Sequence, residues 1–236
     1  MKNLFLLFYN FIDNYFHSKK IFEYLKKNVF LKKGIIFDIG AHNGKIAKNF
    51  SLLYNDSKIY CFEPNKKMFN KIKDLKNKNL IIKNLAAGDK NKKILLNINI
   101  LDLTTSLKKL NKNSLYLKLK KLIIGQSKKD YSQKIKVVML DTFCKKAKIK
   151  QIDLMKIDCE GYEYQVLCGA SKIIKKTKYI IIEIQKNDMY QNYSEKKIES
   201  FLEKNNFKMI RNFSFPFMFF QDRIYKNMKI NSEYYQ

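Results

Sequence analysis

The amino-acid sequence predicts an α/β fold, with a mostly parallel central sheet flanked by helices and an antiparallel pair of strands at its C-terminal end. Apolar runs of strand length alternate with helical patterns from residue 35 to residue 184, as expected for parallel strands joined by helical crossovers. A glycine-containing turn at residues 34–44 joins the first strand to the first helix. Two apolar runs flank Pro216 in residues 207–225, and they predict the antiparallel pair.

The spacing of apolar residues places the elements along the chain. We expect strands near residues 35–39, 58–62, 80–84, 152–157 and 179–184, and helices near 45–54, 66–76, 142–148 and 162–175, with a further helix capped by Ser194. Residues 94–100 and 135–139 also look like strands. The polar segment 104–133 is either a lid over a site or a surface loop. The expected domain covers residues 34–230.

Residues 1–33 form an expected N-terminal helical extension, because apolar and basic residues alternate there at helical spacing. The apolar run is too short to span a bilayer, and no small-residue cleavage site follows it. Either these helices pack on the domain, or they form an interfacial helix with lysines toward anionic lipid. The protein is therefore expected in the cytoplasm, with a peripheral contact to the inner membrane face as the alternative.

The formal net charge of +27 at pH 7 suggests nucleic acid as a partner, but the composition argues against specific recognition. Arg211 and Arg223 are the only arginines, whereas selected phosphate or guanine recognition usually uses the planar arginine fork. The four cysteines show no C-x-x-C spacing and are expected to be reduced. With His17 and His42 as the only histidines, a zinc site is not expected.

The turn after the first strand, GIIFDIGAHNG, has the spacing of a nucleoside-binding loop. Asp38 ends the strand, and Gly40 and Gly44 flank Ala41 and His42. A dinucleotide loop needs G-x-G-x-x-G, but His42 and Lys45 occupy the second and third glycine positions. S-adenosylmethionine (SAM) has no phosphate, so D-x-G-x-x-x-G suffices, with Asp38 facing the ligand's ammonium. The spacing therefore favours SAM over NAD.

Two further segments extend this candidate site. Glu63 ends the second strand at the offset where a carboxylate takes ribose hydroxyls, although Glu63 and Pro64 are also compatible with a simple helix start. After the third strand, Ala86 and the small residues beside it can admit an adenine edge, with Asp89 available to the adenine amino group. An ordinary turn explains that segment equally well.

The strand at residues 152–157 runs into Asp158-Cys159-Glu160-Gly161 and then into a helix. Ligands of open α/β sheets bind beyond the carboxyl ends of the strands, so Asp158 and Glu160 should lie in one crevice with Asp38 and Glu63. Carboxylates that converge repel one another, and at least one proton affinity should rise, which suits a general base. Either residue can instead cap the helix. Glu183, in an apolar strand, should face the crevice or bind a lysine.

Taken together, these segments resemble the FkbM family of SAM-dependent methyltransferases. The resemblance covers roughly residues 34–226. The matching segments are FDIGAHNG at 37–44, FEP at 62–64, NLAAGD at 84–89, LDT at 140–142, DLMKIDCEGYEYQVLCGA at 153–170, Glu183 and DRIY at 222–225.

That resemblance implies a Rossmann-like class I methyltransferase fold and methyl transfer to a hydroxyl, commonly of a sugar, a glycan or another secondary metabolite. Asp158 is then the first candidate for the base and Glu160 the second. Some class I O-methyltransferases use a carboxylate-held divalent cation, a role that Asp158 with Glu160 could fill, and the sequence does not choose. Two alternatives remain: hydroxyl methylation of RNA, and a non-catalytic module of the same fold at a membrane surface.

Overall fold

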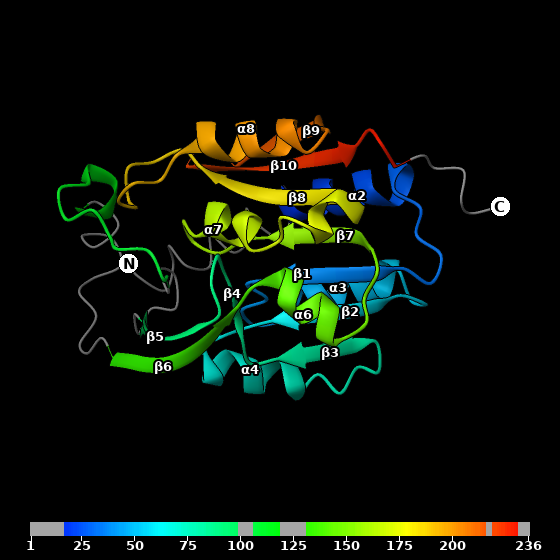
Figure 1. The fold of residues 1–236 in the computed structure, drawn as a ribbon, viewed down its shortest axis with the longest axis horizontal. Coiled ribbons are helices and arrows are strands. Elements are labelled where there is room, and N and C mark those ends of the chain that lie inside the picture. The colour runs from blue at the N-terminus through cyan, green and yellow to red at the C-terminus, as the bar shows by residue number, and fades with distance from the viewer. Residues whose placement is uncertain (1–16, 99–105, 119–130, 216–218, 231–236) are drawn as a thin grey trace.

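The computed structural model describes residues 17–98, 106–118, 131–215 and 219–230, and all statements below concern these residues. Their strands form a seven-stranded sheet in the order β3-β2-β1-β7-β8-β10-β9 and a three-stranded sheet in the order β4-β6-β5. In Figure 1 the large sheet runs from β3 near the bottom to β10 near the top. The first five strands of that order pair in parallel, and β10 pairs antiparallel with β8 and β9. The predicted fold class is confirmed.

The elements follow one another in this order: α2 (Lys19–Asn28), β1 (Ile35–Ile39), α3 (Lys45–Leu53), β2 (Lys58–Phe62), α4 (Lys66–Lys73), β3 (Leu80–Lys83), β4 (Ala86–Ala87), β5 (Lys92–Ile98), β6 (Tyr131–Val138), α6 (Leu140–Lys146), β7 (Ile152–Ile157), α7 (Glu163–Cys168), the 3₁₀ helix η2 (Ile173–Lys176), β8 (Thr177–Gln185), α8 (Glu195–Lys204), β9 (Phe207–Ser214) and β10 (Phe220–Asn227). The five predicted core strands all form, and the predicted helices at 45–54, 66–76 and 142–148 match α3, α4 and α6 to within a few residues.

The single helix predicted over residues 162–175 is wrong, because α7 ends at Cys168 and η2 begins at Ile173. Gly169 follows α7 so closely packed that a Cβ there would lie 1.9 Å from the Gly88 carbonyl oxygen. The Asp141 carboxylate then accepts hydrogen bonds from the backbone N–H groups of Lys172 and Ile173 at 2.8–3.1 Å. These side-chain bonds start a new turn.

The segment predicted as a lid or loop, residues 104–133, is described only in part. Residues 106–118 lie against the chain that follows β8: the Asn111 N–H donates to the Met189 carbonyl at 2.8 Å, and the Gln191 N–H donates to the Lys109 carbonyl at 2.9 Å. Leu117, Met189 and Tyr190 form a small buried cluster at this contact. Strand β6 begins at Tyr131, inside the predicted connection, and builds the second sheet with β5.

Side chains alternate along each strand between two cores, as the pleat requires. Phe37 and Met155 contribute to the core that α6, α7 and α8 cover. Ile36 and Leu154 contribute to the core that α2 and α3 cover. The described part of the N-terminal extension, α2, thus packs on the domain with Ile21 and Leu25 buried, while residues 1–16 lie outside the description. Along the described stretches, the helices are all too short or too polar to cross a membrane.

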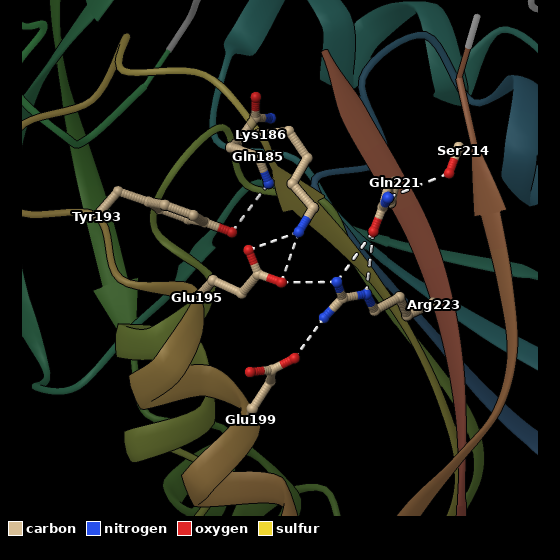
Figure 2. A network of polar contacts seen from close by, with 8 residues as sticks. All are labelled: Gln185, Lys186, Tyr193, Glu195, Glu199, Ser214, Gln221 and Arg223. Atoms are coloured by element: carbon tan, nitrogen blue, oxygen red, sulfur yellow. Dashed lines mark hydrogen bonds and ion pairs between the residues drawn. The ribbon is translucent and has the colours of Figure 1, made fainter. Parts of the chain in front are cut away.

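A network of ion pairs joins α8 to the C-terminal strands (Figure 2). The Arg223 guanidinium on β10 donates to Glu195 Oε1 at 2.6 Å and to Glu199 Oε1 at 2.7 Å. Lys186, just after β8, donates to the same Glu195 carboxylate at 2.6 and 2.7 Å. The Tyr193 hydroxyl accepts from the Gln185 N–H at 3.0 Å. This network fixes the segment between β8 and α8.

We expect Arg223→Met to lower the free energy of unfolding by about 2 kcal/mol, because two glutamates and Gln221 lose a buried charged donor. The other arginine offers a matched control. Arg211 is exposed and lies over the rings of Tyr24 and Phe213, so Arg211→Met should cost less than about 1 kcal/mol. Urea unfolding of both variants tests this, and equal losses would contradict it.

Candidate active site

The candidate site lies where the chain connections change direction. Strands β1 and β7 are neighbours, with β2 and β3 on one side and β8, β10 and β9 on the other. The helical connections therefore leave this point in opposite directions, and open α/β sheets bind ligands at such a switch point. Asp38, near the carboxyl end of β1, is directly opposite Lys156 on β7, and Asp158 follows the end of β7.

The glycines of the β1–α3 loop serve different packing needs. Gly40 has φ +86°, and a Cβ on it would lie 1.8 Å from the Asp158 carbonyl oxygen, so only glycine lets the two loops approach. Gly44 has φ +79°, and its missing Cβ points at Leu75 and Ile72 rather than into open space. Between them, Ala41 is buried, and His42 is exposed in the left-handed region with φ +48°.

Glu63 organises this loop from the end of β2. One carboxylate oxygen accepts the His42 N–H at 2.7 Å, and the other accepts the Asn65 N–H at 2.8 Å. Asn65 in turn caps α4 by accepting from the Lys67 N–H at 2.9 Å. The helix-start alternative for Glu63 is therefore present in the structure. A contact with ribose stays a prediction.

The other predicted cofactor contacts lie beside β4. Ala86 is buried in the core of the second sheet with Val137, so its side chain packs there. The partly exposed Asp89 carboxylate lies 3.5 Å from both the Tyr162 hydroxyl and the Lys92 ammonium. The Pro64 carbonyl accepts from Asn84 Nδ2 at 3.0 Å and from Gln133 Nε2 at 3.2 Å. Their roles toward adenine stay predictions.

Asp38 is a buried carboxyl group at the switch point. The residue is 1% exposed, and its Oδ2 has no hydrogen-bond partner within the described residues. Burial raises the pKa of Asp38 to about 6, with the Lys156 ammonium opposing the rise and the Asp158 carboxylate adding to it. Burial is the largest cause of this rise and the Asp158 carboxylate adds a smaller part, so the expected role of converging carboxylates stays a prediction.

Asp158, the first candidate for the base, is held by a lysine that we did not single out from the sequence. Lys156 Nζ donates to Asp158 Oδ2 at 2.7 Å, with the lysine side chain buried and the aspartate partly exposed. Burial alone would lower the pKa of Lys156, but the carboxylates of Asp158, Asp222, Asp38 and Glu183 outweigh it and raise the pKa. Lys156 is therefore a buried ammonium.

Glu160, the second candidate, belongs to a tightly held loop. Glu160 and Gly161 have φ +50° and +91°. The Tyr190 hydroxyl donates to the Glu160 carboxylate, and Ser106 Oγ donates to the Glu160 carbonyl at 2.5 Å. The described part of the 104–133 segment thus contacts the loop that carries both candidate bases. This contact is compatible with the lid hypothesis without testing it.

Glu163 holds the same loop from inside and was also missed. Its Oε1 accepts the N–H groups of Cys159 and Gly161 at 3.0 and 3.1 Å, while its Oε2 is buried without a partner among the described residues. Burial raises the pKa of Glu163 to about 8, although the backbone hydrogen bonds oppose the rise. Its position in the D-x-E-G-x-E segment was visible in the sequence, but its inward orientation was not.

Glu183 on β8 is buried and directly opposite Asp222 on β10. Its Oε1 accepts from Gln185 Nε2 at 2.5 Å, and burial, reinforced by neighbouring carboxylates, raises the pKa of Glu183 well above its usual range. Asp222 behaves differently: burial would raise its pKa, but the hydrogen bond from His17 and the Lys156 ammonium hold it below the usual value. The hydrogen-bond partner that the structure shows for Glu183 is Gln185, and Lys156 acts on this carboxylate only through its charge, so both alternatives for Glu183, the crevice and a bound lysine, stay predictions.

Metal ligation was left open at the sequence level. Within the described stretches, the His, Cys, Asp and Glu side chains do not gather in any group of three or more that could hold a metal ion. The four cysteines are free thiols. The cation that the structure does show beside the carboxylates at the switch point is the Lys156 ammonium.

The doubly wound sheet, the glycine loop at its switch point and the antiparallel C-terminal pair define a Rossmann-like class I methyltransferase fold. Residues 38–209 match the sequence model of the family described as "Methyltransferase FkbM domain". The chain belongs to the FkbM methyltransferase family, as its motifs predicted.

Individual relatives are distant. The 2-O-methyltransferase NoeI of Sinorhizobium fredii (strain NBRC 101917 / NGR234) is 24% identical over 166 residues, which make up 66% of this chain and 65% of that protein. The matched part is thus less than two thirds of that relative's length. A fibrillarin structure from Methanococcus jannaschii, a pre-rRNA processing protein, has 14% identity and a TM-score of 0.51, covering 89% of this chain and 74% of that one. The structure of a fibrillarin/Nop5p complex has 14% identity and a TM-score of 0.51, and the match covers 89% of this chain and 81% of that one. These two structures support the fold alone.

We expect Asp38→Asn to change how stability depends on pH. Because the pKa of Asp38 is about 6 rather than 3.8, ionising this carboxyl destabilises the folded protein as the pH rises through that interval. Asparagine cannot ionise, so the variant should gain about 1–3 kcal/mol relative to wild type between pH 4 and pH 8. Urea unfolding at both pH values measures the gain, with the exposed Asp74→Asn as control. A difference that does not vary with pH would contradict this assignment.

Proposed function

We propose that the protein transfers the methyl group of SAM to a hydroxyl of a sugar, a glycan or another secondary metabolite. The observation that carries the proposal is the buried Asp38 carboxylate at the switch point, with Oδ2 unpartnered among the described residues and its pKa raised to about 6. A cation on a ligand stabilises the ionised form of a buried carboxyl group that lacks a partner. The amino group of SAM provides one, whereas NAD would bring phosphates toward an acidic edge.

The residues around Asp38 fit the remaining parts of SAM. The loop of Gly40, Ala41, His42 and Gly44 borders the amino-acid part, and the Glu63 carboxylate accepts from the ribose hydroxyls while it holds the loop through the His42 N–H. Pro64, Ala86 and Asp89 border the adenine. When bound, SAM supplies a methyl group on a sulfonium.

Asp158 accepts the proton in this scheme. The acceptor hydroxyl approaches the methyl in line, a C–O bond forms as the C–S bond breaks, and the hydroxyl proton passes to the Asp158 carboxylate. Lys156 holds one oxygen of that carboxylate at 2.7 Å, which fixes its orientation. Glu160 is the second candidate for the base, and its carboxylate is held by Tyr190. A bound divalent cation is not part of the proposal.

Support for a hydroxyl acceptor comes from the similarity to NoeI, which is a 2-O-methyltransferase. The segments 1–33 and 104–133, outside the motifs shared with the family, are the expected source of acceptor specificity. We further propose a cytoplasmic location, with peripheral membrane contact through residues 1–33 as the alternative. Specific binding of nucleic acid is not part of the proposal.

Calorimetric titration with S-adenosylhomocysteine (SAH), and separately with NAD, tests the cofactor. Moderately high salt suppresses the non-specific attraction between a protein of net charge +27 and the phosphates of NAD. We expect one-site binding of SAH alone. Binding of NAD alone, or of neither ligand, would contradict the proposal, and the second result would favour a non-catalytic module.

We expect Asp38→Ala and Glu63→Ala each to weaken SAH binding by at least tenfold, because a counter-ion and a ribose acceptor are lost. The control is Asp74→Ala, an exposed carboxylate at the end of α4, which should bind as wild type does. Normal SAH affinity in both Asp38→Ala and Glu63→Ala would overturn the site assignment.

Asp158→Asn should bind SAH normally yet lose turnover by about 100-fold or more, because the amide cannot take the proton. The assay uses labelled SAM and sugars found as acceptors in a screen with the wild-type protein. Full turnover in Asp158→Asn would transfer the base role away from this residue, and Glu160→Gln is the next variant to assay.

A further inference from the structure

Lys156 is a charged residue of β7 at the candidate site, in a strand that is apolar except for Asp153 near its start. It is 6% exposed, directly opposite Asp38 on β1 and Ile181 on β8. On this face of the sheet, the apolar side chains of Ile36, Leu154, Ile181 and Ile224, one on each of four strands, belong to the core under α2 and α3. On each of these strands, the next side chain of that face toward the carboxyl edge of the parallel strands is charged. They are Asp38, Lys156, Glu183 and Asp222.

The charged row is held in place from both sides. Lys156 Nζ binds Asp158 Oδ2 at 2.7 Å at the crevice. On β10, the Asp222 carboxylate accepts from His17 Nε2 at 2.7 Å, and the His17 ring lies edge-on to the stacked rings of Phe215 and Phe220, with ring centroids 5.6 and 5.4 Å away. The hydrogen bond to Asp158 orients the ammonium, and the Asp222 carboxylate, held by His17, acts on it through charge.

Methyl transfer changes the charge next to this row. The donor SAM carries a positive sulfur, and the product SAH carries a neutral one. If Asp158 takes the acceptor proton, the acceptor oxygen lies between that carboxylate and the methyl, so the carboxylate lies near the sulfur by the requirements of the reaction itself. An uncompensated carboxylate there would hold SAM more tightly than SAH.

We propose that Lys156 is a specificity-determining residue of the cofactor site: its buried ammonium offsets the acidic row and so keeps the site from favouring cationic SAM strongly over neutral SAH. The inference rests on the proposed SAM-dependent function. Its consequence is that Lys156 sets how strongly the product competes with the substrate. Lys156 thus acts through charge on the ligands, in addition to orienting Asp158.

The test compares the ratio of the SAM and SAH dissociation constants in matched variants at pH 8. Lys156→Met removes the ammonium and keeps most of the side-chain volume. Lys178→Met is the control, because Lys178 is equally buried at 7% exposed but lies near the start of β8, away from the carboxyl edge. Lys156→Arg restores the charge.

We expect Lys156→Met to shift the ratio of the two dissociation constants toward tighter SAM binding by about tenfold. This is the order of magnitude expected for one unit charge acting on another charge within a partly buried site. Lys178→Met and Lys156→Arg should keep the wild-type ratio within about twofold. A ratio in Lys156→Met within twofold of wild type would overturn the inference. Failure of the wild-type protein to bind either ligand would overturn the proposed function instead.

A second measurement uses the wild-type protein and so does not depend on the folding of a variant. In ¹⁵N-lysine-labelled protein, the Lys156 ammonium should give a side-chain resonance at neutral pH, because its hydrogen bond and burial slow proton exchange, and Lys156→Arg assigns it. We expect this resonance to differ between the SAM and SAH complexes. The same position in both complexes would contradict a charge coupling between Lys156 and the sulfur.

Discussion

The ion pair of Lys156 with Asp158 is the interaction on which the candidate site depends. It places an ammonium among carboxylates contributed by β1, β8 and β10, the strands on either side of β7. Without that cation, the buried carboxylates of Asp38, Glu183 and Asp222 would lie near one another and near the partly exposed Asp158 with like charge, at a cost of several kcal/mol. With it, Asp158 is held by a hydrogen bond of 2.7 Å, and the ammonium opposes the rise that burial causes in the pKa of Asp38 and of Glu183.

A second constraint is the close approach of the two loops above that ion pair. The β1–α3 loop and the β7–α7 loop touch at Gly40, where any side chain would collide with the Asp158 carbonyl. Glu63 holds the first loop through backbone N–H groups, and Glu163 holds the second in the same way. Each loop is thus anchored by a buried carboxylate, Glu63 at the end of β2 or Glu163 at the start of α7, so these acidic residues have a structural role.

The sequence predicted what depends on local pattern. Strand and helix spacing gave the five core strands, and the glycine and acidic positions marked the switch point. It missed Lys156, although a charged residue in an apolar strand is the same signal that singled out Glu183. It also missed the contact of His17 with Asp222, because residues 205 positions apart meet only through the packing of α2 on the sheet. The break between α7 and η2 required the position of Asp141, which no local pattern supplies.

The charge of the whole chain and the charge of the candidate site have opposite signs, and this difference bears on which methyl acceptor the site can take. The chain carries a net charge of +27, yet the side chains around the switch point are mainly acidic, with Lys156 already paired. A polyanion would be attracted to the surface at long range and repelled at the proposed active site. A neutral polyhydroxyl group meets no such opposition, and its hydroxyls can donate to the carboxylates that line the edge. Local charge therefore favours a sugar-like acceptor more than the composition of the whole chain favours a nucleic acid.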